Sequence, residues 1–443
     1  MKHDSPSNPE AKKPRGIRRL SFRRKRIGHL SDRQSRALTG LAMIYALRMM
    51  GLYMILPVLS LFALSLKGAT PVLIGFALGA YGLTQAIFQI PLGHLSDRIG
   101  RKGVISIGLG LFAAGSLLAA FGQHIVWLIA GRILQGSGAV ASSVVALAAD
   151  LSPDHARTQA MARLGLWVGV SLALGVVAGP VLASTFGVPA LFIGTAILSS
   201  IAIVYLQFLV PEPVHISSPA KQDRLNKPSS SVKGLGPEEF LSGKKGQLHM
   251  IDLKAVLTQP TLFLLCAGIF LLHATLTVIF VIMPIQLAAH VGQGMLSLIL
   301  APTIAAGLAL MVMSARMADR HRRRRVIFLY GALLFIASCG VMTAMPGTFI
   351  GLTVGLGLFI LSLSLLEPLL PALMSRQAPR QHRGTAIGVF HMCQFFGSFA
   401  GGPVGGAFIH SRGSILFLIL GLLGIIWSAV VLRSREGFFH GID

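Results

Sequence analysis

One carboxylate lies deep inside a long apolar run of this sequence. Glu367 stands between LSLSLL and PLLPALM, whereas the other fourteen of the fifteen acidic residues fall in polar segments, loops or predicted helix ends. A charged carboxylate in hydrocarbon is unfavourable unless it faces a wet cavity, pairs with a cation or takes up a proton. Glu367 is therefore a candidate for proton binding and release. A structural carboxyl group, hydrogen-bonded between helices near one membrane face, would also explain it.

Two arginines and two histidines also interrupt apolar runs. An unpaired guanidinium in hydrocarbon is unfavourable, so Arg48 and Arg132 are expected to face a central cavity. Bonds to backbone carbonyls or glutamines explain Arg48 equally well. His273 and His391 are further candidates, although a single membrane His commonly bonds to a neighbouring helix. The other polar side chains available to a cavity are Gln85, Gln89, Gln286, Gln394, Tyr53 and Tyr81.

The remaining side chains available to such a cavity are Phe, Met, Leu and Ala, a lining that suits a hydrophobic or amphipathic compound. Two embedded arginines against one acid favour a neutral or anionic compound over a cation. We expect no catalytic residues, no metal site and no cofactor other than a proton gradient. No phosphate-binding glycine loop indicates an ATP-driven pump. Three cysteines, far apart in sequence, are expected to be buried thiols: Cys266, Cys339 and Cys393.

The elements that must position these residues are membrane helices. Hydrophobic residues make up 53% of the 443 residues and charged residues 12%, and the mean hydropathy is +0.72, values foreign to a soluble domain. The sequence therefore predicts an all-α integral membrane protein, because its runs are too long for barrel strands. Twelve runs reach the roughly 20 residues that cross a bilayer, at about 37–65, 71–92, 103–122, 124–149, 160–184, 188–209, 261–290, 295–316, 326–345, 348–375, 384–409 and 414–433.

Basic residues predict the orientation of these helices. Connections on one side hold 35 of the 39 Lys and Arg residues, and the other side holds only Lys67 and Arg412. The positive-inside rule places the rich side, with both termini, in the cytoplasm. The net charge of +24 then reflects this topology. The basic segments are also expected to contact anionic lipids, and no nucleic-acid partner is expected.

The polar segments divide the chain into five predicted parts. A basic arm (1–36) precedes the first six helices (37–210), and a short tail (435–443) follows the last six (261–434). The segment 211–260 is rich in Pro, Ser, Lys and Gly, so we expect a cytoplasmic linker.

The turn GHLSDRIGRK between the second and third runs places an acid and basic residues where the chain must reverse, and a weaker copy surrounds Asp319. Asp97 is expected at the N-terminal dipole of the helix beginning near Gly384. Arg101 is expected to pair with Asp150 at the end of the fourth run. Both contacts are expected only when the cytoplasmic side is closed, so the turn would act as a gate. The gating residues are then Gly93, Asp97, Arg98, Gly100, Arg101, Lys102 and Asp150.

An internal repeat supports two related halves. Pro180 pairs with Pro403 at an offset of 223, and each follows a G-x-x-x-G step. The segment YMILP ending at Pro57 is echoed by FVIMP ending at Pro284. Duplicated halves of six helices allow one half to rock against the other around a site at the membrane midplane.

The turn GHLSDRIGRK resembles the signature of the major facilitator superfamily between its second and third helices. GRILQGSGA, which contains Arg132, resembles the fourth-helix motif of that family, and its match implies that Arg132 handles protons or contacts substrate. GVVAGP, with Gly175, Gly179 and Pro180, is similar to a fifth-helix motif of proton-coupled antiporters, although its trailing glycine pair is Ala-Ser here. These motifs imply a twelve-helix transporter with two pseudo-symmetric halves.

Further segments resemble the YajR-like branch of drug:proton antiporters, namely LRMMGLYMILPVLSLFA, YGLTQAIFQIPLGHLSDRIGRK and LEPLLPALMSR. Members of that branch can carry a soluble domain after the last helix, which we expect to be absent here. The expected function is monomeric, proton-coupled export of a small molecule across a bacterial inner membrane by alternating access. Proton-driven import of a neutral or anionic solute is the nearest alternative. A non-transporting membrane sensor or scaffold is an alternative of another class.

Overall fold

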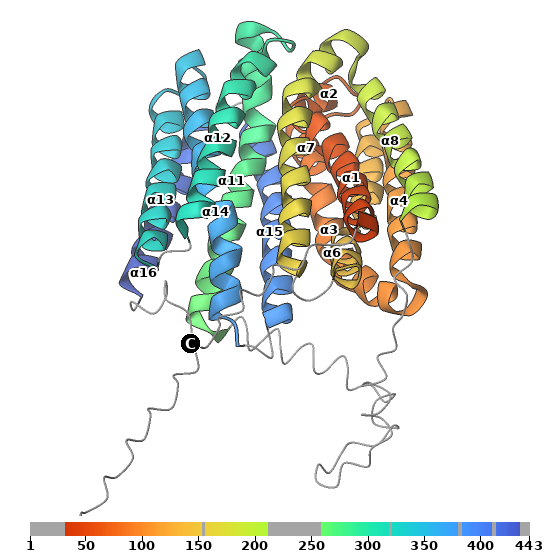
Figure 1. Ribbon diagram of the computed structural model, residues 1–443. Helices are drawn as coiled ribbons and strands as arrows, with labels where there is room; N and C mark the ends of the chain where they lie inside the picture. The colour runs from red at the N-terminus through yellow and green to blue at the C-terminus, as the bar shows by residue number, and fades with distance from the viewer. Residues whose placement is uncertain are drawn as a thin grey trace, which may run out of the picture.

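The computed structural model describes residues 32–152, 156–210, 258–318, 321–379, 383–409 and 413–434. Most of the predicted basic arm, the central linker and the tail lie outside these residues, as do their predicted contacts with anionic lipids. Within the described residues the chain is helical. Figure 1 shows the N-terminal helices as one bundle and the C-terminal helices as a second bundle beside it.

Fourteen helices make up the described part of the chain. In chain order they are α1 (Asp32–Ile55), α2 (Leu59–Leu64), α3 (Pro71–Ile99), α4 (Arg101–Phe121), α5 (Ile125–Ser137), α6 (Ala141–Asp150), α7 (Arg157–Phe186), α8 (Val188–Leu209), α11 (Pro260–Val291), α12 (Leu296–Ala318), α13 (His321–Ala344), α14 (Phe349–Gln377), α15 (Arg383–Ala407) and α16 (Ser414–Arg433). They confirm the predicted all-α fold of twelve crossings in two halves.

Two predicted spans are interrupted in the structure. The first, predicted as one run over 37–65, ends at Ile55 and resumes as the short helix α2. The fourth breaks between Ser137 and Ala141, where Gly138 leaves the helical conformation and α6 then completes the crossing. Hydropathy alone does not reveal these breaks, because the residues on both sides of each break are apolar.

Length and composition identify eleven helices in the described residues as able to cross a membrane. The twelfth crossing is α15, which is rich in glycine and carries His391 and Gln394, so its mean hydropathy is low. This composition suits an inner helix that packs closely against α3 and α11. The most polar crossing is therefore the one least suited to facing lipid.

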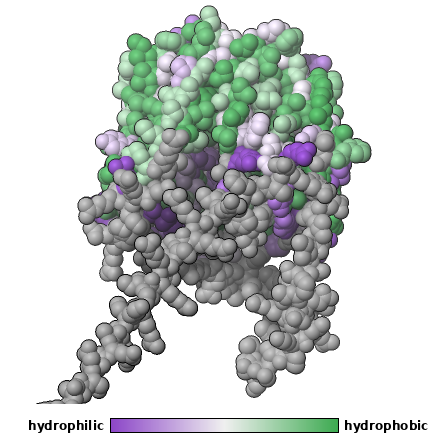
Figure 2. Space-filling view, in the orientation of Figure 1, coloured by the Kyte–Doolittle hydropathy of each residue, from purple (hydrophilic) through white to green (hydrophobic). Residues whose placement is uncertain are grey.

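The two ends of the bundle differ in polarity. Arg98, Arg376 and Arg433 lie in the last turns of their helices at one end, which we call the basic face. The other end, the opposite face, carries the turns at Gly187 and Gly292. Figure 2 shows a broad hydrophobic surface above polar residues near the basic face. This distribution fits a multi-pass membrane protein.

The internal repeat has a spatial counterpart in each half. A Cβ on Gly179 of α7 would meet the carbonyl oxygen of Met54 in α1, and a Cβ on Gly401 of α15 would meet that of Ala274 in α11. Small residues at these positions let the backbones approach closely. The two prolines that follow these steps, Pro180 and Pro403, lie inside their helices. Each half therefore contains the same close helix pair, as the repeat predicted.

The two halves contact one another mainly in the part of the bundle nearer the opposite face. Gly75 of α3 and Gly402 of α15 touch backbone to backbone, so that a Cβ on either would meet the carbonyl oxygen of the other. The Phe76 and Phe399 rings pack edge to face at 5.6 Å between centroids. Ser297 of α12 donates a hydrogen bond to the carbonyl oxygen of Val177 in α7 (2.7 Å). The structure is therefore closed at the opposite face.

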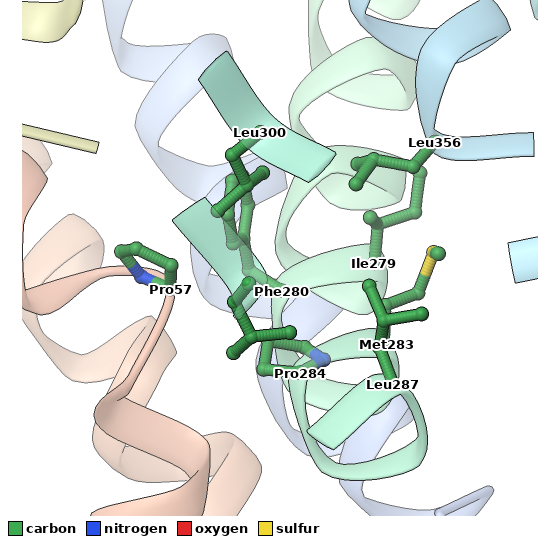
Figure 3. Close-up of a pocket in the computed structure, with 9 residues that line it drawn as sticks. Pro57, Ile279, Phe280, Met283, Pro284, Leu287, Leu300 and Leu356 are labelled. Carbon is green, nitrogen blue, oxygen red and sulfur yellow. The ribbon is translucent and has the colours of Figure 1, made fainter. Parts of the chain in front are cut away.

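A small cavity remains inside this closed end. Its volume is about 20 Å³, and its lining is entirely apolar, made by Pro57, Ile279, Phe280, Met283, Pro284, Leu287, Leu296, Leu300 and Leu356. Figure 3 shows Pro57 of the N-terminal half facing Phe280 and Pro284 of the C-terminal half. The two prolines that the repeat relates thus lie near one another where the halves meet.

Candidate functional site

Four of the predicted site residues form a hydrogen-bonded cluster in the C-terminal half. The side-chain amide of Gln394 donates through Nε2 to Glu367 Oε1 (2.9 Å) and to His273 Nε2 (2.9 Å). Its Oε1 accepts a hydrogen bond from His391 Nδ1 (2.8 Å). A second carboxylate oxygen, Glu367 Oε2, lies 3.6 Å from His273 Nε2. The amide of Gln394 is thus the centre of the cluster.

The helices of the C-terminal half explain how this cluster is held. Glu367 lies on α14, His273 on α11, and Gln394 with His391 one turn apart on α15. Pro368 follows Glu367 directly inside α14, and proline cannot donate a backbone hydrogen bond, which loosens the helix there. The polar side chains project from three helices toward one point.

Glu367 is only partly enclosed. Its side chain is 39% exposed, although its Oε2 atom is buried without a hydrogen-bond partner among the described residues. Glu367 also interacts electrostatically with Tyr53 on α1 of the other half. The carboxyl group therefore lies where the two halves face one another, and a proton or a donor could still be added to it.

Arg48 occupies the interior of the N-terminal half. It is 1% exposed, and its Nη2 donates to the Tyr81 hydroxyl (3.2 Å), to Gln85 Oε1 (3.4 Å) and to the carbonyl oxygen of Gly138 (3.1 Å). The Gly138 carbonyl belongs to the break after α5, and a cation is favoured at a helix C-terminus. The guanidinium also lies over the ring of Phe112, 5.0 Å from its centroid. Its Nε and Nη1 have no hydrogen-bond partner among the described residues.

Arg132 is enclosed in the same half. It is 2% exposed, donates to the carbonyl oxygen of Ala77 (3.3 Å) and to Gln135 Oε1 (2.9 Å), and lies over the Tyr81 ring at 4.8 Å. Gln135 Nε2 in turn donates to Ser116 Oγ (2.7 Å). The sequence indicated Gln135 only as a motif residue and gave no signal for Ser116, which comes from another helix.

The predicted site residues therefore separate into two groups. Glu367, His273, His391 and Gln394 meet one another in the C-terminal half, whereas Arg48, Arg132 and Gln85 lie in the N-terminal half. The expectation that both arginines face a central cavity is wrong in this conformation. Inside the N-terminal half, the two guanidinium groups contact carbonyl oxygens, amide oxygens and aromatic rings. These contacts take the place of the ones expected in a cavity.

In the structure, the turn within GHLSDRIGRK consists of a single residue between two helices. Gly100, with φ at +93°, separates α3 from α4, and this backbone conformation favours glycine. The expected ion pair is present, with Arg101 Nε 3.2 Å from Asp150 Oδ2. Arg101 Nη1 also donates to Ser96 Oγ (2.7 Å), and Lys102 Nζ donates to the carbonyl oxygen of Gln207 (3.2 Å).

The ion pair corrects one expectation about this turn. Arg101 and Asp150 belong to the same half, so their contact does not require the halves to meet at the basic face, and it is present in a structure closed at the opposite face. The turn thus braces α4 against α6 within the N-terminal half. Gly93 approaches Ser142 of α6, and Arg98 is exposed. The side chain of Asp97 lies outside the described residues, so its proposed contact near Gly384 stays a prediction.

The Arg101 and Asp150 pair is expected to contribute little to stability. The two side chains are 22% and 42% exposed, and ion pairs of such exposure contribute about 0.2–1 kcal/mol. Asp150→Asn should lower the free energy of unfolding by less than about 1 kcal/mol, and the difference should shrink at high salt because solvent ions screen exposed charges. Chemical unfolding of the detergent-solubilised protein at two salt concentrations measures both effects. A larger, salt-independent loss would contradict this account.

Comparison with known proteins places this architecture in a family. The sequence matches the Major Facilitator Superfamily over residues 41–362 and 265–439. It is 37% identical over 407 residues to the inner membrane transport protein YajR of Escherichia coli K12, covering 91% of this chain and 84% of that protein. Multidrug resistance protein 2 of Bacillus subtilis is 24% identical over 349 residues, covering 78% and 82% of the two chains.

Solved structures share the fold. A bacterial homologue of the human lysosomal transporter Spinster, solved in an inward-facing and unoccupied conformation, superposes with a TM-score of 0.70 at 13% identity, covering 93% of this chain and 98% of that chain. The relatives are transporters rather than enzymes. The similarity to YajR also supports the branch that the sequence motifs indicated. From its helices, its internal repeat and these matches, the chain belongs to the major facilitator superfamily of membrane transporters.

Proposed function

We propose that this transporter exports small hydrophobic or amphipathic compounds in exchange for protons by alternating access. The observation that carries the proposal is the cluster of Glu367, His273, His391 and Gln394. It contains the one carboxylate within the described membrane crossings, away from their ends. Titratable groups in contact with one another can exchange a proton at the surface where the halves separate.

The arrangement of the two halves supports a rocking mechanism. Close glycine contacts hold α1 against α7 and α11 against α15 inside the halves, so each half can move as a unit. Contacts between the halves, such as that of Gly75 with Gly402, lie toward the opposite face. Breaking them would open that side while the packing inside each half is retained.

The charge balance favours neutral or anionic substrates. Arg48 and Arg132 have no carboxylate partner among the described residues, so the interior of the N-terminal half is positive. A cation approaching Glu367 would also approach these charges, whereas an anion would be attracted. We therefore expect a substrate with an apolar body and no positive charge. Selective transport of lipophilic cations that is abolished by Glu367→Gln would overturn this preference.

The name of one relative favours export as the direction of transport. The Bacillus relative is named a multidrug resistance protein, which fits export. A symporter that imports a solute with protons could use the same cluster, and it differs from the exporter in the direction in which an imposed gradient drives the substrate. We propose that the protein acts as a monomer in a bacterial inner membrane with both termini in the cytoplasm.

Proteoliposome flux tests this function directly. A panel of neutral, anionic and cationic amphipathic compounds is followed under an imposed pH gradient, first in one direction and then in the other. Glu367→Gln should reduce gradient-driven flux by about 100-fold, the lower end of the range for loss of one positioned proton-transfer group, because an amide cannot take up a proton at neutral pH. Exchange of substrate without a gradient should fall much less.

The matched control is His94→Gln, which changes an exposed histidine at the basic end of α3 and should leave flux unchanged. Flux toward the acidic side identifies export against protons, and flux with the protons identifies symport. Undiminished gradient-driven flux in Glu367→Gln would refute the proton-binding role. Absence of flux for every compound, with intact folding, would favour a sensor or scaffold.

A further inference from the structure

The side-chain amide of Gln394 touches both groups that could carry the transported proton. We propose that Gln394 is a positioning residue whose two amide orientations make Glu367 and His273 gain and lose protons together. The proposal deepens the proposed proton-coupled function, because it concerns the number of protons that the same cluster takes up. It predicts two protons, taken up in one cooperative step.

The orientation in the structure fits a cluster without these protons. Gln394 Nε2 donates one hydrogen to Glu367 Oε1 and the other to His273 Nε2, so the carboxyl group is an acceptor and His273 Nε2 carries no hydrogen. His273 Nδ1 then holds the ring proton and donates it to the carbonyl oxygen of Ile269 (3.3 Å). His391 donates through Nδ1 to Gln394 Oε1. Every contact pairs a donor with an acceptor.

Turning the amide by 180° fits a cluster with two more protons. Gln394 Oε1 would then accept from a protonated Glu367 and from a hydrogen on His273 Nε2, at the positions that Nε2 holds now. His273 keeps its Nδ1 hydrogen on Ile269 and becomes an imidazolium. The amide nitrogen would donate to His391 Nδ1, so the ring proton of His391 moves to its own Nε2. The net change is two protons taken from solvent, one on Glu367 and one on His273.

States with a single extra proton match neither orientation. A proton on His273 alone makes two donors face each other at Gln394 Nε2 in the present orientation, and Glu367 Oε2, 3.6 Å from His273 Nε2, lies beyond hydrogen-bond distance. After the turn, two acceptors face each other at Glu367. A proton on Glu367 Oε2 has no acceptor within hydrogen-bond distance among the described residues in the present orientation, because His273 Nε2 lies 3.6 Å away and already accepts from Gln394. If only Glu367 is protonated after the turn, the unprotonated Nε2 of His273 faces the amide oxygen of Gln394, so two acceptors meet. Unmatched buried groups are unfavourable, so both protons should bind in one step.

The helices packed around this cluster add few other titratable groups to it. On α11 and α15 the thiols of Cys266 and Cys393 lie beside one another. The Leu296–Ser314 stretch of α12 contains no ionisable side chain. On α13, Tyr330 is exposed and Cys339 packs toward Gly421 of α16.

From the other half, α1 presents Tyr53, which interacts electrostatically with Glu367, Tyr45, Tyr81 and Arg48. Arg48 disfavours a second positive charge, which opposes protonation of His273, but it does so equally for both amide orientations. The coupling therefore comes from the hydrogen-bond pattern of Gln394 and not from a neighbouring charge.

Infrared difference spectroscopy of the purified, detergent-solubilised protein measures the coupling without any substrate or gradient. The carboxyl band of Glu367 is identified by its loss in Glu367→Gln and is followed against pH. For two protons bound together, the band should pass from 10% to 90% of its change within about one pH unit, and for independent sites it takes about two. We expect about one pH unit for the wild type and about two for Gln394→Leu.

Gln207→Leu, an exposed glutamine at the basic end of α8, is the matched control and should keep the steep titration. His273→Gln serves as a second variant if Gln394→Leu does not fold, and it should also broaden the titration because it removes one of the two protons. A wild-type titration spread over about two pH units, or one as steep in Gln394→Leu as in the wild type, would overturn the proposal. Neither result depends on whether Glu367→Gln abolishes flux, so the two proposals fail separately.

Discussion

Gly402→Val is expected to abolish closure at the opposite face and, with it, transport. A Cβ at Gly402 would meet the carbonyl oxygen of Gly75, a backbone atom held within its own helix. Neither helix can yield locally, so the halves must separate there. Overpacking of this kind costs about 1–3 kcal/mol or more, and with the two extra methyl groups of valine we expect about 4 kcal/mol. That shift changes the equilibrium between conformations about 1,000-fold.

Accessibility of an engineered cysteine measures this effect. Ser297→Cys lies at the interface, since Ser297 is 5% exposed and bonds to the Val177 carbonyl oxygen of the other half, and it should react slowly with a polar thiol reagent in an otherwise wild-type background. Adding Gly402→Val should expose it. Gly388→Val is the matched control on the same helix, because a Cβ there meets nothing within 4 Å. Equal reactivity in both glycine variants would contradict the role assigned to this contact.

Arg132→Met is expected to destabilise the N-terminal half by about 2 kcal/mol. The change removes the donor to Gln135 Oε1 and to the Ala77 carbonyl oxygen, both inside the bundle, and each buried acceptor left without a donor costs about 1–3 kcal/mol. Removing the buried charge of Arg132 offsets part of this destabilisation. Methionine keeps the length of the side chain, so the loss reflects hydrogen bonds more than packing against Tyr81.

A double variant separates the effect of the lost hydrogen bond from the effect of lost packing. Arg132→Met with Gln135→Leu removes donor and acceptor together, and it should be more stable than Arg132→Met alone, because replacing both partners by apolar groups is nearly neutral. Ser116 keeps its bond to the Phe112 carbonyl oxygen (2.7 Å) in that variant. Thermal unfolding in detergent compares the three proteins. A double variant no more stable than Arg132→Met alone would show that the hydrogen bond to Gln135 is not the cause.

Most of the fold could be predicted from the sequence because the bilayer imposes it. Spans of suitable length must become helices, since backbone groups in hydrocarbon need partners within the segment. The repeat that joins Pro180 to Pro403 indicated the two halves, and their glycine contacts are equivalent in the structure. The breaks after Ile55 and at Gly138 were missed, because a helix break inside an apolar run leaves hydropathy unchanged.

The candidate site was harder to predict, because its residues meet through space. The sequence identified Glu367, His273 and Gln394 separately but gave no sign that one amide joins them. The arginines were identified as unusual, yet their enclosure follows from Gln135, Gly138 and two aromatic rings on other helices. Sequence alone shows that a buried charge needs partners and not which partners it finds.

The cavity between Pro57 and Pro284 has a mechanical consequence. A void of about 20 Å³ with an apolar lining has room for about one water molecule but lacks the polar partners that would hold it there. Opening the halves at this face admits solvent or repacks the side chains, so the empty volume disappears. Compression favours the state of smaller volume. Hydrostatic pressure is therefore expected to shift this transporter away from the arrangement closed at this face.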